Sequence, residues 1–226
     1  MKNKLERFAD LFNLPNVYQN PSVTEPRLLG LGGEEADMKG AWREKHFKNN
    51  NPIVLELACG KGEYTLNLGK DFPEQNFIGV DLKGNRLWKG ASDAVQMGLN
   101  NVAFIRTQIE HLDLFFAEGE VDEIWITFPD PFLRPSKAKK RLTSTRFLEI
   151  YRKFLKPDGI VQLKTDDPTL YDFTLETLEE EKLEILYQNN DIYASELAFP
   201  VLAYKTTYEK MHLINQRTIK YVRFKL

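Results

Sequence analysis

The stretch of sequence that decides the fold is Ile53-Val54-Leu55-Glu56-Leu57-Ala58-Cys59-Gly60-Lys61-Gly62. Its first half is a short apolar run of the kind that forms a buried strand, and its second half is a turn with two glycines. Residues 63–70 have the pattern of a helix. A strand, a glycine turn and a helix in this order are typical of the ligand-binding edge of an α/β domain.

The alternation of strands and helices continues through the rest of the chain. Further strands are predicted at residues 77–81, 102–106, 121–126, 160–164, 182–187 and 218–224. Helices are predicted at residues 85–97 and 143–155, and Asp167 and Pro168 suit the N-cap and first position of another. This order predicts the α/β class, with a doubly wound, mostly parallel, seven-stranded Rossmann-like sheet. The carboxyl ends of its parallel strands then share one edge, where ligands bind.

The first fifty residues differ from the rest of the chain. Residues 1–50 are predicted to form an N-terminal arm with short helices at 3–14 and 40–48, and residues 51–226 form the α/β domain. Between the two short helices, residues 15–33 are rich in proline and glycine, which favours an extended arm or loop.

Composition narrows the class of protein. Cys59 is the only cysteine and the three histidines have no metal-ligand spacing, so we expect neither a disulfide framework nor a metal. No apolar run approaches the roughly 20 residues that span a bilayer, and residues 1–7 lack the apolar core of a signal peptide. A cytoplasmic protein without a membrane partner is therefore expected. The net charge of −2 confines any nucleic-acid site to a local patch.

Two carboxylates lie at predicted strand ends beside the glycine turn. Asp81 follows the second strand about twenty residues after Gly60 and Gly62, the usual place for a carboxylate that binds ribose hydroxyls. Glu56, at the end of the first strand, would repel a pyrophosphate but suits the ammonium and sulfonium of S-adenosylmethionine. The turn lacks both G-x-G-x-x-G and a P-loop. The alternative is a generic strand-turn-helix unit in which Glu56 is merely solvated.

The fourth strand leads into Phe128-Pro129-Asp130-Pro131-Phe132. Prolines on both sides make a stiff loop that fixes the Asp130 carboxylate at the active edge. Such a carboxylate can accept hydrogen bonds from N1–H and the exocyclic amine of guanine. N7 of a purine already has a lone pair, so an enzyme that alkylates it mainly has to orient the reactants. The alternative is a structural proline turn with a capping aspartate.

A basic segment follows at once, Arg134-Pro135-Ser136-Lys137-Ala138-Lys139-Lys140-Arg141. It has five positive charges in eight residues and no acid, although the chain as a whole is slightly acidic. Because it adjoins the predicted active edge, we interpret it as a phosphate-binding segment, with a merely solvated charged face as the alternative.

Together these motifs resemble the bacterial tRNA (guanine-N7-)-methyltransferases, the TrmB family, from about residue 38 to the C-terminus. The resemblance rests on residues 56–62, on residues 128–131 with their basic tail, on Thr165-Asp166 and on Thr206-x-x-Glu209. It implies a class I S-adenosylmethionine-dependent methyltransferase that methylates N7 of a guanosine in the variable loop of tRNA (position forty-six). The product would be 7-methylguanosine.

The resemblance also implies residue roles. The catalytic residue would be Asp130. The cofactor-binding residues would be Glu56, Gly60, Gly62, Asp81, Gln108 and Asp130. The substrate-binding residues would be Arg134, Asp166, Thr206 and Glu209, and the RNA contacts would be Lys137, Lys139, Lys140 and Arg141. Gln108 stands where the family usually has an aspartate or asparagine, and Arg134 stands where it has a lysine. For Thr206 and Glu209 the resemblance is the only warrant, since the segment by itself is predicted as a loop.

Three other functions stay open from the sequence. The first is a methyltransferase for a small molecule or a protein, against which the basic segment argues. The second is a non-catalytic RNA-binding protein on this fold, against which Glu56, Asp81 and Asp130 argue. The third, a nicotinamide dehydrogenase, lacks the fingerprint glycines. The expected partner is tRNA, and the chain is expected to be a monomer or a homodimer.

Overall fold

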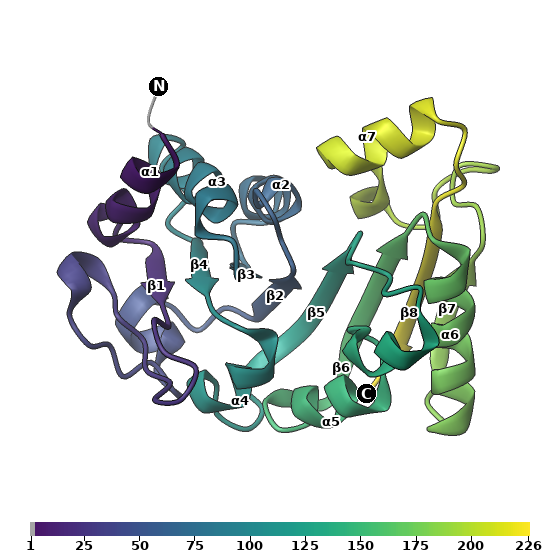
Figure 1. The fold of residues 1–226 in the computed structure, drawn as a ribbon, viewed down its shortest axis with the longest axis horizontal. Helices are drawn as coiled ribbons and strands as arrows, with labels where there is room; N and C mark the ends of the chain where they lie inside the picture. The colour runs from purple at the N-terminus through teal and green to yellow at the C-terminus, as the bar shows by residue number, and fades with distance from the viewer. Residues whose placement is uncertain (1–2) are drawn as a thin grey trace.

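A computed structural model of the chain describes residues 3–226 and contains one eight-stranded sheet (Figure 1). The strands are β1 (Val17–Gln19), β2 (Ile53–Leu57), β3 (Asn76–Asp81), β4 (Val102–Arg106), β5 (Val121–Thr127), β6 (Leu155–Thr165), β7 (Ile185–Asn189) and β8 (Lys220–Lys225). Their order across the sheet is β1-β4-β3-β2-β5-β6-β8-β7. All neighbours pair in parallel except that β8 is antiparallel to both β6 and β7.

The predicted fold class is confirmed, and the sheet has one strand more than expected. The additional strand, β1, comes from the segment predicted as an extended arm and pairs with β4. All three of its residues are buried, and the neighbouring Asn16 donates from its side chain to the Ala91 carbonyl. A run this short gives no clear alternation of apolar and polar residues, so its pattern does not predict a strand. Residues 1 and 2 of the predicted arm lie outside the described residues.

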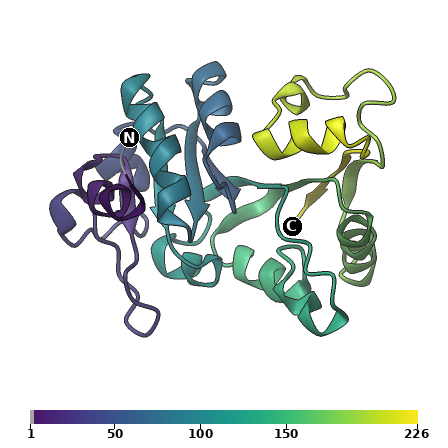
Figure 2. The ribbon, with the colours of Figure 1, turned by 45° about the horizontal axis from the view of Figure 1, so that its top comes forward.

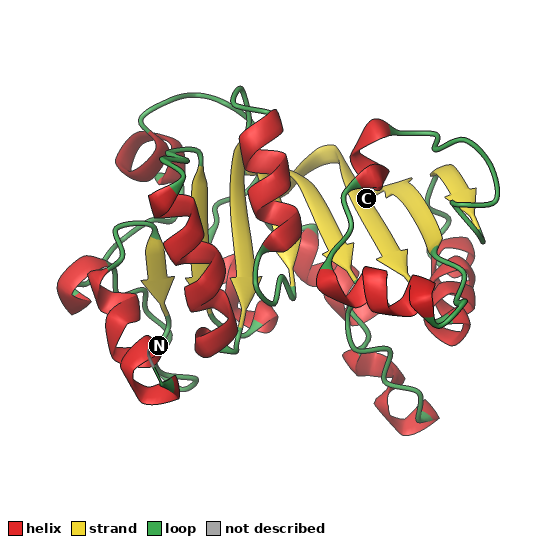
Figure 3. Cartoon of the chain, turned by 90° about the horizontal axis from the view of Figure 1, so that it is seen from above, coloured by secondary structure: helices red, strands yellow, loops and turns green. Residues whose placement is uncertain are grey.

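Helices cover both faces of the sheet. They are α1 (Lys4–Asp10), α2 (Glu63–Asp71), α3 (Gly84–Gln96), α4 (Leu112–Phe115), α5 (Thr145–Tyr151), α6 (Pro168–Glu180) and α7 (Thr207–Ile214). The short turns of helix are η1 (Leu11–Asn13), η2 (Leu31–Gly33), η3 (Trp42–Phe47), η4 (Ile109–His111), η5 (Pro135–Lys140) and η6 (Pro200–Ala203). In Figure 1, α1, α2, α3 and α7 lie above the sheet while α4 and α5 lie below it, and Figure 3 shows the strands side by side beneath the covering helices. Each face therefore has its own apolar core.

The order in which the strands are added to the sheet reverses between β2 and β5. From β2 the chain proceeds outward through β3 to β4, and it then returns to the other side of β2 to form β5 and β6. In a sheet of this kind ligands bind at the carboxyl edge beside such a switch point. The glycine turn, Asp81, Gln108, the Asp130 loop and Asp166 all lie at the carboxyl ends of parallel strands, so the fold brings them to this edge.

Two helix starts test the local predictions. Asp167 is the N-cap of α6, with its Oδ1 accepting from the Leu170 N–H at 2.8 Å, and Pro168 is the first helical residue, as predicted. Thr206, expected in a loop, is the N-cap of α7, and its Oγ1 accepts from the Glu209 N–H at 3.2 Å. The spacing Thr-x-x-Glu is also that of a capping pattern, which is the physical reason for the difference.

Across residues 3–226, no helix is both long and apolar enough to span a membrane. In the same residues no group of three or more His, Cys, Asp or Glu side chains is placed to hold a metal ion.

Candidate active site

The glycine turn between β2 and α2 is held by Asp81 at the end of β3. Its Oδ2 accepts from the Gly60 N–H at 2.9 Å and its Oδ1 from the Lys83 N–H at 2.7 Å. Gly60 and Gly62 have φ angles of +60° and +68°, which favour glycine. A methyl group added at Gly60 would have no heavy atom within 4 Å, so the turn faces open space there. The turn thus leaves room for a ligand directly beside a carboxylate.

Glu56 lies beneath this turn instead of facing the open space. Only 3% of the residue is exposed. Its Oε2 accepts from the Thr65 N–H at 2.8 Å and from the Thr65 hydroxyl, and its Oε1 accepts from the Thr127 Oγ1 at 2.6 Å. Burial raises the pKa of Glu56 to about 7, against the opposing effect of these hydrogen bonds. Glu56 therefore joins β2, α2 and β5 at the switch point and puts a titratable group under the turn.

Gln108 completes this side of the edge. It follows β4 directly after Thr107, is half-buried, and precedes η4 as its N-cap residue. Asp81 ends β3 and Gln108 follows β4, so the two residues lie at the ends of neighbouring strands. Gly60 faces the open space beside the turn. This edge thus combines the Gln108 amide, the Asp81 carboxylate and a glycine turn above the buried Glu56. Such a set of groups suits a nucleoside cofactor that carries a positive charge.

Asp130 lies in a conformationally strained loop after β5. The carboxylate is exposed, and its Oδ1 accepts from the Phe132 N–H at 3.1 Å. Phe128 and Phe132, on either side, have φ angles of +49° and +43°, which are uncommon for bulky residues. Such conformations cost free energy and are found mostly at functional sites. The loop therefore fixes an exposed carboxylate at the edge, as the flanking prolines predict.

Arg141 holds the same loop from behind. Only 5% of this residue is exposed, and its guanidinium donates to the carbonyl of Pro131 at 3.0 Å and to that of Phe132 at 3.2 Å. It also lies over the ring of Phe173, 4.4 Å from the centroid. This position differs from the expected RNA contact, because the guanidinium is occupied inside the protein.

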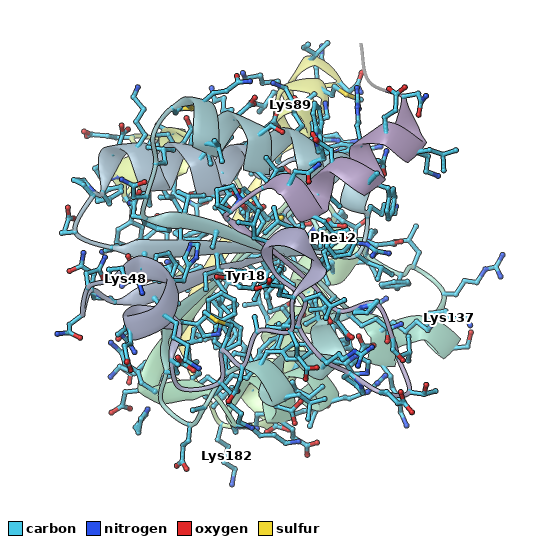
Figure 4. The ribbon with its side chains drawn as sticks, turned by 90° about the vertical axis from the view of Figure 1, so that its left-hand side faces the viewer. Phe12, Tyr18, Lys48, Lys89, Lys137 and Lys182 are labelled. Carbon is cyan, nitrogen blue, oxygen red and sulfur yellow. The ribbon has the colours of Figure 1, made fainter. Side chains whose placement is uncertain are left out.

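The rest of the basic segment is exposed. Arg134 precedes η5, which contains Lys137, Lys139 and Lys140, and all four side chains reach solvent. Figure 4 shows Lys137 standing out from the body of the protein, on the side opposite Lys48. These four cations form an exposed basic surface directly after the Asp130 loop.

Asp166, after β6, contacts two side chains from the C-terminal part of the chain, an arginine and a histidine. Its Oδ2 lies 2.7 Å from the Arg217 guanidinium and 3.2 Å from Nδ1 of His212. The ring of His212, on α7, is stacked on Phe128 with centroids 5.8 Å apart. The predicted substrate-binding aspartate is therefore joined to α7 and to the Asp130 loop.

The predicted substrate-binding pair Thr206 and Glu209 lies at the start of α7. Glu209 is fully buried and its Oε1 is 2.8 Å from Nζ of Lys164, which is also fully buried. Thr207, next to the cap, donates its N–H to Glu63 at 2.6 Å, directly after the glycine turn. Figure 2 shows α7 beside α2 above the strands. The structure thus brings this segment to the carboxyl edge, although it follows no parallel strand.

Three residues that organise this site are not among the predicted site residues: Thr65, Thr127 and Lys164. The two threonines have no distinctive spacing. Lys164, however, ends an apolar strand pattern, and a lysine in a buried strand is almost always paired. That pattern could have indicated a buried ion pair.

Comparison with known proteins supports the fold and identifies the family. A family model described as "Putative methyltransferase" matches residues 50–222. The crystal structure of the 16S rRNA methyltransferase KamB has a TM-score of 0.65 to this chain, covering 86% of it and 97% of KamB at 14% sequence identity. The chain is therefore a methyltransferase of the Rossmann-like class I fold.

Sequence relatives define the family more closely. A tRNA (guanine-N(7)-)-methyltransferase of Bacteroides thetaiotaomicron is 49% identical over 225 residues, which are 100% of this chain and 86% of the relative. Its counterpart in Christiangramia forsetii is 50% identical over 226 residues, which are 100% of this chain and 98% of the relative. The chain belongs to the tRNA (guanine-N(7)-)-methyltransferase family, which confirms the resemblance seen in its motifs.

Proposed function

We propose that this enzyme transfers a methyl group from S-adenosylmethionine to N7 of a guanosine in the variable loop of tRNA, giving 7-methylguanosine. The observation that supports this most directly is the loop of Asp130. It holds one exposed carboxylate at the carboxyl edge and continues into an exposed basic surface. A base-orienting acid and a phosphate-binding surface are thus neighbours in the chain, as methylation of an RNA base requires.

Asp130 is the proposed catalytic residue. Its carboxylate oxygens can accept hydrogen bonds from N1–H and the exocyclic amine of guanine. These hydrogen bonds would orient the base so that the N7 lone pair faces the methyl donor. A carboxylate also favours the positive charge that the ring acquires on alkylation. Because no proton has to leave N7 first, orientation and electrostatics are the main contributions expected from the protein.

The proposed cofactor-binding residues are Glu56, Gly60, Gly62, Asp81, Gln108 and Asp130. When bound, S-adenosylmethionine would supply the methyl group from its sulfonium centre. Asp81 would accept from ribose hydroxyls, and the open space at Gly60 supports a ligand beside this turn. Glu56 would act from below the turn, where its charge favours a cationic ligand without direct contact.

The RNA contacts and the acceptor site complete the proposal. Lys137, Lys139 and Lys140 would bind phosphates, while Arg141 serves the loop instead. Arg134, Asp166, Thr206 and Glu209 are the proposed substrate-binding residues. The partner is tRNA in the cytoplasm, the base is recognised in an exposed loop, and we expect a monomer or a homodimer that needs no metal.

The experiment incubates the purified enzyme with labelled S-adenosylmethionine and unmodified tRNA, digests the RNA and identifies the methylated nucleoside. 7-Methylguanosine is the expected product. Another methylated nucleoside would overturn the role of Asp130. Transfer only to a protein or a small molecule would favour the other methyltransferase function. An absence of cofactor binding would favour the non-catalytic RNA-binding function.

A further inference from the structure

Lys164 is a fully buried lysine whose ammonium group is completely paired. It is the next-to-last residue of β6, at the active edge, and its Nζ donates to the carbonyl of Leu202 at 2.9 Å and to that of Tyr204 at 3.1 Å. The third partner is Oε1 of Glu209, at 2.8 Å. Burial lowers the pKa of Lys164, and the Glu209 carboxylate opposes that shift. The lysine thus ties β6 to the segment that leads into α7.

Glu209 is held at one oxygen only. Besides Lys164, the Tyr193 hydroxyl donates to Oε1 at 2.7 Å. Oε2 is buried and has no hydrogen-bond partner among the described residues. A buried acceptor without a donor is unfavourable, and a buried ion pair can often be replaced by apolar side chains without loss of stability. Stability alone therefore does not explain this arrangement.

The pair fixes α7 in contact with both sides of the active edge. At its start, the backbone and hydroxyl of Thr207 donate to Glu63 in the first turn of α2. Further along, His212 stacks on Phe128 beside the Asp130 loop. The Lys164–Glu209 pair lies on the buried side of the helix between these two contacts. A shift of the pair would move α7 relative to both the glycine turn and the catalytic loop.

We propose that Lys164 is a positioning residue for the acceptor base: through Glu209 and the two carbonyls it sets the place of α7 against the Asp130 loop. This inference rests on the proposed function. Lys164 is fully buried and its three hydrogen-bond partners are protein groups, so it would act on the acceptor base only through the segments that it holds.

The test compares Lys164→Met with Lys220→Met, a control in the neighbouring strand whose Nζ contacts only Thr218. The readouts are cofactor affinity by calorimetry and the single-turnover rate at saturating tRNA. A misplaced base should lower the rate of Lys164→Met by about tenfold to a hundredfold, with cofactor affinity within about twofold of the parent. A parental rate in this variant would overturn the inference. If the parent itself makes no 7-methylguanosine, the proposed function fails instead.

A double variant, Lys164→Met with Glu209→Leu, separates positioning from folding. It replaces the ion pair by apolar groups and should recover thermal stability that Lys164→Met loses. Positioning predicts that its rate stays at least about tenfold below the parent although the fold is restored; because Glu209 is itself a proposed substrate-binding residue, the decisive result for this variant is the opposite one. Recovery of the rate together with stability would show a purely structural pair and would overturn the inference.

Discussion

Two buried glutamates face the same side of the sheet, and they are stabilised in different ways. Glu56 lies under the turn between β2 and α2, which with the end of β3 is the proposed cofactor half of the edge, and it is bound by two threonine hydroxyls and one backbone amide. Glu209 lies on α7, which with the end of β6 is the proposed acceptor half, and it is bound by the ammonium of Lys164 and one tyrosine hydroxyl. Both carboxylates lie near Tyr64, and burial of the phenol, with their charges as further causes, raises its pKa.

The two glutamates differ in how readily their charge and their position can change. Burial raises the pKa of Glu56 to about 7, and its neutral hydrogen-bond partners only partly oppose the shift, so the charge of Glu56 changes when a cation binds nearby or the pH moves. Glu209 has a full positive charge beside it and a helix fixed around it. The cofactor half is thus electrostatically adjustable, whereas the acceptor half is held in one geometry. The predictions below test this division, from the largest effect to the smallest.

Asp130 lies where the two halves meet, so its removal should have the largest effect. We expect Asp130→Ala to lower the methylation rate by roughly a hundredfold or more, the scale for loss of a preorganised group in the transition state. The measurement is single-turnover transfer at saturating tRNA and cofactor. A near-normal rate would mean that neither half depends on this carboxylate for alignment.

Glu56 should make the stability of the cofactor half depend on pH. Its pKa is raised in the folded state, from 4.5 to about 7, so the folded protein binds a proton more tightly than the unfolded chain. The free energy of unfolding should therefore decrease as pH rises, by about 1.4 kcal/mol between pH 6 and pH 8 from this group. Urea denaturation of parent and Glu56→Gln at both values measures the difference. Equal slopes for the two proteins would contradict the raised pKa.

Removing the exposed lysines of η5 should weaken RNA binding without changing the geometry of either half of the edge. Lys139→Ala with Lys140→Ala is expected to weaken tRNA binding several-fold and to reduce the salt slope by roughly 0.7–0.9 per lost contact. Cofactor affinity should not change. Lys70→Ala, an exposed lysine at the last turn of α2, is the control. An unchanged tRNA affinity across a salt series would remove the phosphate-binding role of η5.

The two halves also differ in how far the sequence predicts them. In the cofactor half the acids and glycines lie in one strand-turn-helix unit and at the end of the next strand, so local pattern and strand order place them. Glu56 and Asp81 were therefore expected at this edge, and they lie there. Their burial was less predictable: whether Glu56 faces the ligand or the protein depends on Thr127, 71 residues away.

In the acceptor half the decisive contacts join distant segments. Lys164 meets the carbonyls of Leu202 and Tyr204, 38 and 40 residues further on, and Asp166 meets Arg217 after 51 residues. No periodic pattern reports contacts of that separation. Without the family resemblance, Thr206 and Glu209 would be a helix cap and its partner. Arg141 shows the same limit, because composition groups it with exposed cations while the fold buries it beneath the Asp130 loop.

The smallest expected effect comes from the two glycines of the cofactor half, which are needed for different reasons. At Gly60 only the positive φ opposes a side chain, since an added methyl meets nothing within 4 Å; at Gly62 it would lie 2.5 Å from Cε1 of Phe104. Gly60→Ala should therefore cost about 1 kcal/mol of stability and weaken cofactor binding, because its methyl enters the open space. Gly62→Ala should cost more stability, because the ring of Phe104 has to move. Denaturation midpoints and cofactor titration check both variants. Equal stability losses would mean that backbone conformation alone determines the cost, and unchanged cofactor affinity in Gly60→Ala would move the ligand away from this turn.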